Sequence, residues 1–185
     1  MKIDDIILSY INKDKYNRKL GRYWATDIYS IKKGYTTPEN FFKSNDIGID
    51  GCKMILTGKA NEEILTKLFK KMKVDFIPQD KKEIKINKEI ILVVKPDFVF
   101  PDYIIETKYP FSMTKTKKIP ERYYDQLEAE YRAYNKTVYL GLISSPFNVV
   151  LLEYTPSKRR WNNIQKLLID FHDKLKQIEA VSKKT

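Results

Sequence analysis

The amino-acid sequence predicts an α/β fold in which helices flank a mixed central β-sheet. Three observations support this class: the chain has 185 residues, 42% of them are hydrophobic and 13% aromatic, and short β-patterned runs lie between helix-patterned segments. We expect one domain over 1–185. It should comprise an N-terminal helical part (1–57), a central core (58–156) and a C-terminal helix (157–185).

Four segments before residue 73 have helical signals. Residues 3–11 place their large apolar side chains on one helical face, and 26–34 begin at a potential N-cap threonine and end at glycine. Pro38 within 37–39 occupies a favoured first helical position, which predicts another helix start. The clearest pattern is the amphipathic segment 61–72.

The pattern then changes to short β runs separated by Asp/Lys, Asn/Lys and Pro-Asp turns. These runs span 74–78, 83–87, 90–94, 98–100 and 103–107. A helix is expected from about 120 to 134, followed by strands at 138–144 and 149–154 and a helix after Ser157.

Composition narrows the classes of function. Lys and Arg number 35 against 24 Asp and Glu, and a net charge of +11 predicts a polyanionic partner, most often nucleic acid. The single cysteine cannot form an internal disulfide or ligate an iron–sulfur cluster with partners of its own kind. No apolar run approaches the ~20 residues of a membrane span. Asp4 and Asp5 stand where a signal peptide needs positive charge, so we expect a cytoplasmic protein.

The most informative stretch is 90–108. If Pro101 and Asp102 form the centre of a tight turn, the register places Asp97 directly opposite Glu106 on the neighbouring strand. Opposed residues have Cβ atoms ~5 Å apart, and two like charges there are unfavourable unless a cation lies between them. The register therefore predicts a divalent-cation site.

Lys108 lies two residues beyond Glu106, so its side chain projects from the same face of the strand. A divalent ion with an ammonium group beside it suits phosphodiester hydrolysis, in which the lysine orients or deprotonates the nucleophile. Unlike Glu106-Thr107-Lys108, the similar triplets 80–82 and 83–85 do not follow apolar residues with an aspartate on the neighbouring strand. The charged face of 83–85 is interpreted as solvated. Asp102 is rejected as the partner of Glu106, because the two are ~13 Å apart along the strand.

Pro96-Asp97 followed by Glu106-Thr107-Lys108 resembles the PD-(D/E)xK nuclease superfamily, and within it RecB-type exonucleases and the Cas-four-type nucleases of CRISPR adaptation. The segment that begins at Gly58 is similar to an upstream motif of those families, with Glu62 at the histidine position. Gln126 matches their downstream glutamine, but Tyr131 comes one residue later than their tyrosine. The similarity runs in order from Tyr23 to Tyr154.

The resemblance implies a restriction-endonuclease-like core and a DNA nuclease that depends on Mg²⁺, with Mn²⁺ as a substitute. It implies metal ligation by Glu62, Asp97, Glu106 and Thr107, and catalytic roles for Asp97, Glu106, Lys108 and Gln126. The resemblance does not imply an iron–sulfur cluster, because the sequence lacks the cysteines with which the Cas-four-type proteins ligate one. No glycine-rich phosphate loop occurs, so no nucleotide cofactor is expected.

Two alternatives stay open. One is a catalytically degenerate module that binds nucleic acid without cutting it, and the other is a structure-specific or junction-resolving endonuclease. The resemblance implies single-stranded DNA or DNA ends as the substrate, for exonuclease or endonuclease action. A homo-oligomer and a helicase or integrase partner are both compatible with the sequence, and a membrane partner is not expected.

Tyrosines and cations alternate between residues 10 and 35, a pattern typical of single-stranded nucleic-acid binding, although half-buried helix tyrosines explain it equally well. Basic residues also follow the Glu106 strand, and cations at 158–160 open the last helix against its dipole. The residues predicted to contact nucleic acid are Arg22, Tyr23, Lys115, Lys117, Lys118 and Tyr131.

Overall fold

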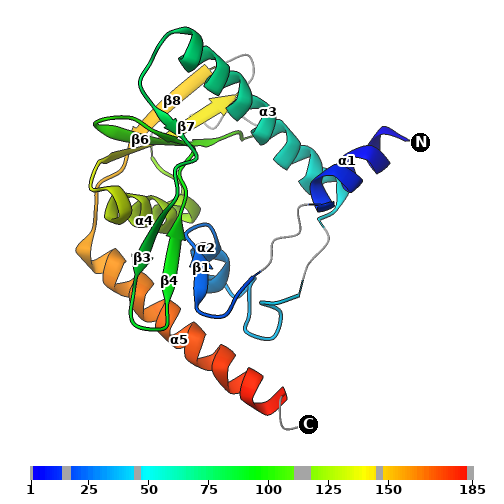
Figure 1. The fold of residues 1–185 in the computed structure, drawn as a ribbon, viewed down its shortest axis with the longest axis vertical. Helices are drawn as coiled ribbons and strands as arrows, with labels where there is room; N and C mark the ends of the chain where they lie inside the picture. Colours follow the sequence, from blue (N-terminus) through cyan, green and yellow to red (C-terminus); the bar gives the residue numbers. More distant parts are fainter. Residues whose placement is uncertain (1, 14–17, 44–46, 111–117, 145–147, 183–185) are drawn as a thin grey trace.

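The computed structural model describes residues 2–13, 18–43, 47–110, 118–144 and 148–182. It confirms an α/β fold in which helices flank mixed β-sheets (Figure 1). The described part of the chain contains no helix that is long and apolar enough to cross a membrane.

The helices lie near their predicted positions, with two differences. They are α1 (Ile3–Lys13), α2 (Asp27–Lys32), α3 (Ile49–Lys71), α4 (Tyr124–Tyr134, after the 3₁₀ turn Glu121–Tyr123) and α5 (Lys158–Ser182). Helix α3 begins at Ile49 rather than at Asn61. The helix start predicted at Thr37 is wrong, because Asn40 Oδ1 accepts the Thr37 N–H at 2.8 Å and closes a turn there.

The strands form two sheets rather than the single sheet that the sequence predicts. The larger has the order β2-β5-β6-β7-β8, and β6 and β7 are parallel strands joined through α4. The smaller has the order β1-β4-β3. The strands are β1 (Arg22–Trp24), β2 (Ile77–Pro78), β3 (Lys82–Lys85), β4 (Ile91–Val94), β5 (Phe98–Val99), β6 (Tyr103–Lys108), β7 (Thr137–Ser144) and β8 (Asn148–Glu153).

The chain passes from the small sheet to the large one at the Pro96-Asp97 dipeptide. Strand β4 ends at Val94 and β5 begins at Phe98. The ring of Pro96 lacks an N–H and disfavours the helical region for Lys95, so the ladder of β4 cannot continue through it. The sheet change therefore places Asp97 immediately before β5.

Helix α4 is the most deeply buried helix that the structure describes. Its residues from Asp125 to Glu130 are all buried, and it contacts β3, β4, β7, α2 and α5. In Figure 1 it lies between the strands and α5. The apolar core around it includes Leu92, Ile104, Leu127, Leu140 and Leu168, all fully buried.

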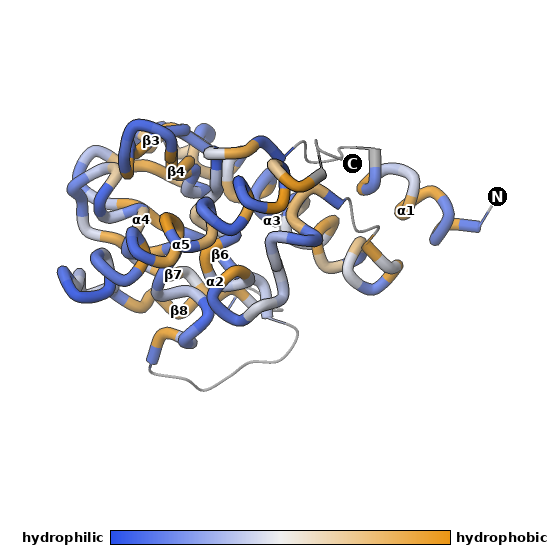
Figure 2. Tube along the Cα trace, turned by 90° about the horizontal axis from the view of Figure 1, so that it is seen from below, coloured by the Kyte–Doolittle hydropathy of each residue, from blue (hydrophilic) through white to orange (hydrophobic). Residues whose placement is uncertain are grey.

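Helix α1 packs against α3 and projects at one end of the molecule (Figures 1 and 2). Of the apolar face predicted for residues 3–11, only Ile11 is buried, and Ile3 and Tyr10 are more than half exposed. Cys52 on α3 is fully buried, as expected for a small apolar side chain.

Strand β1, which the sequence pattern does not predict, places Tyr23 in the core. Tyr23 has no exposed surface, and its hydroxyl lies 2.9 Å from Nδ1 of His172 on α5. A side chain without exposed surface cannot stack on a base, so the nucleic-acid role predicted for Tyr23 is wrong. The His172–Tyr23 contact instead joins α5 to the small sheet.

We predict that His172 makes the fold acid-labile. Burial lowers the pKa of His172, and Lys176 lowers it further. Glu89, whose Oε2 lies 3.8 Å from Nε2 of His172, raises the pKa, as do Asp173 and Glu179. The effect of burial is the largest, so the pKa is lowered overall. In the unfolded chain the pKa is about 6.5. Because the unfolded state then binds the proton first, the free energy of unfolding should fall as the pH drops below that value.

His172 is the only histidine, so its imidazole ¹H resonance reports the folded-state pKa without overlap. Urea denaturation at a series of pH values measures the stability, and the His172→Gln variant should lose this component of the pH dependence. A folded-state midpoint at or above pH 6.5 would contradict the prediction.

Candidate active site

The predicted β-hairpin positions the two central carboxylates. The structure pairs Phe98 with Ile105 and Val99 with Ile104, the register that the sequence predicts. The N–H of Phe100 donates to the carbonyl of Tyr103 at 2.8 Å and closes the turn at residues 101–102. Extended by one residue, this register brings Asp97 beside Glu106.

Asp97 is anchored to the end of β6 by its side chain. Its Oδ2 accepts hydrogen bonds from the N–H of Thr107 at 2.8 Å and from Thr107 Oγ1 at 2.5 Å. The N–H of Asp97 donates to Glu106 Oε2 at 3.3 Å. The Asp97 carboxylate thus takes the place of a backbone carbonyl as acceptor where the ladder between β5 and β6 ends. These hydrogen bonds fix the position of the carboxylate.

Glu106 is the centre of the hydrogen-bonded cluster. It is 3% exposed, and its Oε1 accepts from Lys108 Nζ at 2.5 Å and from Gln126 Nε2 at 2.6 Å. Strand β6 supplies Glu106 and Lys108 from one face, and α4 supplies Gln126. The structure therefore brings together Asp97, Glu106, Thr107, Lys108 and Gln126 as the sequence predicts.

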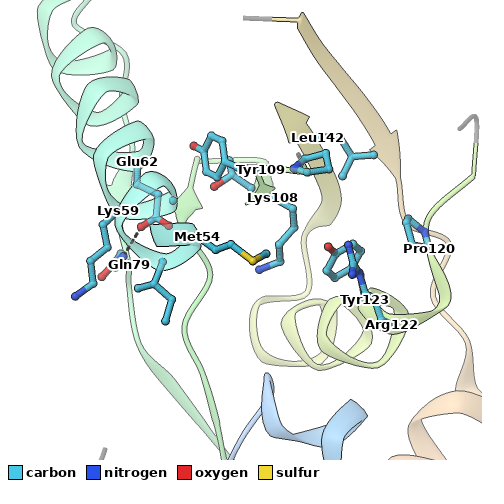
Figure 3. Close-up of a pocket in the computed structure, with 14 residues that line it drawn as sticks. Met54, Lys59, Glu62, Gln79, Lys108, Tyr109, Pro120, Arg122, Tyr123 and Leu142 are labelled. Atoms are coloured by element: carbon cyan, nitrogen blue, oxygen red, sulfur yellow. Dashed lines mark hydrogen bonds between the residues drawn. The ribbon is translucent and has the colours of Figure 1, made fainter. Parts of the chain in front are cut away.

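Glu62 approaches the cluster from α3. Its Oε2 accepts from Gln79 Nε2 at 2.8 Å, and the close-up places it across the pocket from Lys108 (Figure 3). Within the described residues, no three acidic, histidine or cysteine side chains stand close enough to share one metal ion. Glu62 therefore does not complete a preformed three-carboxylate site with Asp97 and Glu106.

The cluster carries excess negative charge in a poorly solvated place. Burial and then the charges of Glu106 and Glu62 raise the pKa of Asp97 to about 8. The pKa of Glu62 is raised by burial and by Glu106. Burial opposes the charge on Lys108, but Glu106 and Asp97 outweigh it and raise the pKa of that ammonium. A further positive charge would relieve this repulsion.

An open pocket of about 930 Å³ lies against the cluster (Figure 3). It lies between α3 and the 3₁₀ turn before α4, and it contains both cations and aromatic rings. Its lining includes Met54, Lys59, Glu62, Gln79, Thr107, Lys108, Tyr109, Pro120, Arg122, Tyr123 and Leu142. A second hollow of about 390 Å³ reaches Asp97 and shares Lys59, Glu62 and Gln79 with it.

Of the residues predicted to contact nucleic acid, those that the structure describes do not line this pocket. Arg22 forms an ion pair with Glu83 on β3. Tyr131 is half-buried against the core, with the Arg132 guanidinium 5.4 Å from its ring centre. Lys118 is exposed. The predictions for Lys115 and Lys117 fall outside the described residues.

The structure adds Glu130 to the site, a residue that the sequence motifs do not predict. Its Oε1 accepts from Gln126 Nε2 at 2.9 Å, and the side chain is 1% exposed. Glu130 lies four residues after Gln126, the position at which the family resemblance expects tyrosine. The i,i+4 spacing was the available signal, since such residues share a helix face.

Comparison with known proteins shows the fold. No family model and no curated protein sequence matches the chain. An alkaline exonuclease from Laribacter hongkongensis is similar with a TM-score of 0.66 and 12% identity, over 89% of this chain and 93% of that one. A phage-related exonuclease from Haemophilus somnus 129PT has a TM-score of 0.62 and 12% identity, over the whole of both chains. The chain thus has the restriction-endonuclease-like fold of these exonucleases.

We predict that Asp97→Asn stabilises the metal-free protein. The amide removes one of the mutually repelling charges, while its oxygen still accepts from Thr107. A gain of about 1 kcal/mol corresponds to a rise in Tm of about 2–4 °C for a chain of this size.

Thermal denaturation in EDTA at pH 8.5 measures the effect, and Asp102→Asn in the exposed turn is the matched control with an unchanged Tm. A lower Tm for Asp97→Asn than for Asp102→Asn would show that the carboxylate cluster is not under electrostatic strain.

Proposed function

We propose that the chain is a divalent-metal-dependent nuclease of the PD-(D/E)xK superfamily that hydrolyses phosphodiester bonds in DNA. The observation that carries the proposal is the hydrogen-bonded cluster of Asp97, Glu106 and Lys108, in which Lys108 Nζ lies 2.5 Å from Glu106 Oε1. The exonuclease fold of the chain supports it. The narrower relationship to RecB-type and Cas-four-type nucleases rests on the sequence motifs.

The donor set fits Mg²⁺, with Mn²⁺ as a substitute. Mg²⁺ is bound in proteins by one or two carboxylates together with waters and substrate phosphates. Asp97 and Glu106 would hold it with an oxygen of Thr107, and Glu62 would support the site from α3. Among the described residues, the backbone N–H and the hydroxyl of Thr107 both donate to Oδ2 of Asp97, which leaves Oδ1 for a cation. When bound, the ion activates water and stabilises negative charge on the phosphate.

The protein side chains have separate roles. The Lys108 ammonium has three donors and uses one toward Glu106, so the others can orient the attacking water or a phosphate oxygen. Gln126 donates to Glu106 and holds its carboxylate in place. These contacts fix the reacting groups before the substrate arrives, which lowers the entropic part of the barrier.

The pocket suits a nucleotide at a DNA end or in a single strand. Tyr109 and Tyr123 offer ring surfaces for a base, and Lys59 and Arg122 offer positive charge for the backbone. One exonuclease with this fold was solved in complex with dAMP, which supports a nucleotide as the kind of ligand this fold can take. Comparing labelled single-stranded, duplex, branched and circular DNA in one assay separates exonuclease from endonuclease action and tests the substrate form.

We predict that Lys108→Ala lowers kcat for cleavage in Mg²⁺ or Mn²⁺ by about 100-fold or more, because the nucleophile loses its orienting group. The chain supplies a matched control, Lys85→Ala, in the similar triplet Glu83-Ile84-Lys85. Lys85 is exposed on β3, remote from the cluster in the fold, and its variant should cleave at the wild-type rate.

Single-turnover cleavage of a labelled oligonucleotide, with and without EDTA, provides the measurement, and circular dichroism checks folding. Wild-type rates in a folded Lys108→Ala protein would refute the proposed mechanism. Mn²⁺ binding without any cleavage by the wild-type protein would favour a module that binds nucleic acid without cutting it.

A further inference from the structure

Helix α4 buries three carboxylates, and they differ in their partners. Asp125 is held by Lys32 Nζ at 2.9 Å and by Arg160 Nη1 at 2.8 Å. Glu128 accepts from Arg132 Nε at 2.8 Å, and it has further donors in a tyrosine hydroxyl and a backbone N–H. Among the described residues, no Lys or Arg side chain lies within hydrogen-bond distance of the Glu130 carboxylate. It is the exception on its helix.

Among the described residues, the Glu130 side chain has one hydrogen bond, and it leads to the active site. Its Oε1 accepts from Gln126 Nε2, and its Oε2 is buried and has no hydrogen-bond partner among the described residues. Gln126 Nε2 also donates to Glu106 at 2.6 Å. The two hydrogens of one amide nitrogen thus join Glu130 to the centre of the cluster.

This double contact fixes the orientation of the Gln126 side chain. An amide can present either nitrogen or oxygen to a neighbour, and these differ by a half-turn about its last torsion. With acceptors on both sides of Nε2, only the orientation with nitrogen toward Glu106 satisfies them. Glu106 then faces a donor rather than an amide oxygen that would repel it.

A role in stability does not account for Glu130. A buried acid without a cation opposes folding, and an apolar side chain of similar volume is often neutral or stabilising in such a place. Burial and the charge of Glu106 also raise the pKa of Glu130 well above its usual range, which agrees with this electrostatic cost. What the Glu130 carboxylate provides at this position is the hydrogen bond to Gln126.

We propose that Glu130 is a positioning residue of the nuclease site: it holds the Gln126 carboxamide with its nitrogen toward Glu106 and thereby fixes Glu106 beside Asp97 and Lys108. This inference rests on the proposed function. Glu130 does not reach the pocket lining, so it acts through Gln126 rather than on the substrate.

The test compares Glu130→Met, which keeps the volume and removes the acceptor, with Glu130→Gln, which keeps an acceptor oxygen. We expect Glu130→Met to lower kcat about 10- to 100-fold, as outer-shell changes do, with little change in KM and an equal or higher Tm. Glu130→Gln should recover most of the loss. Glu128→Met is the matched control on the same helix, and it should lower Tm while leaving kcat per folded molecule unchanged.

A double-mutant cycle tests the route. If Glu130 acts only through Gln126, adding Glu130→Met to Gln126→Met should cause no further loss of kcat. Additive losses would overturn the proposed route. A lower Tm with unchanged kcat per folded molecule in Glu130→Met would assign Glu130 a structural role and overturn the proposal.

A spectroscopic measurement separates this inference from the proposed function. The side-chain NH₂ resonances of Gln126, assigned by their loss in Gln126→Met, should be protected from solvent exchange in the wild type. That protection should be lost in Glu130→Met and kept in Glu128→Met. If the wild type lacks nuclease activity, the proposed function fails, and the resonances still decide whether Glu130 orients Gln126. Unchanged protection in Glu130→Met would overturn the orientation itself.

Discussion

The burial of helix α4 is the constraint on which the rest of the fold depends. Its residues from Asp125 to Glu130 are all buried, and three of those six are acids. Buried charges destabilise the folded state unless they are paired, and two of the helices packed against α4 supply cations to Asp125. Lys32 comes from α2 and Arg160 from the start of α5, and both meet Asp125. The buried carboxylate of Asp125 thus holds both α2 and α5 against α4 through ion pairs.

This pairing also explains the basic start of α5. Cations at a helix N-terminus oppose the helix dipole, and the sequence suggested a ligand role for residues 158–160 as compensation. In the structure, the Arg160 guanidinium is instead satisfied by the buried carboxylate of Asp125, 2.8 Å away. The unfavourable position is offset within the fold, so Arg160 provides no evidence for a ligand.

Local chemistry explains how much of the site the sequence could predict. The turn preference of Pro101-Asp102 and the two-residue period of strands are short-range rules, and together they brought Asp97 opposite Glu106 with Lys108 on the same face. Gln126 followed from a resemblance. Glu130 was not predicted because α4 is rich in charged and tyrosine residues and does not have the sequence of a buried helix. The burial of α4 depends on tertiary contacts. The two-sheet arrangement was not predicted either, because pairing between strands that are distant in the sequence leaves no local sequence pattern.

The position of Glu62 shows how core packing sets the geometry of a polar site. Glu62 and Phe69 lie seven residues apart on α3, so they share one helix face. Phe69 packs on Phe76 and Phe98 with ring centroids 5.3 Å away in both cases. Phe98 directly follows Asp97, so the aromatic contacts tie the end of α3 to the start of β5. Glu62 therefore faces the cluster because an apolar contact two turns along the helix holds α3 there, and Gln79 restrains its carboxylate. The distance between Glu62 and the other carboxylates is thus set by aromatic packing, while their mutual repulsion is what a cation would relieve.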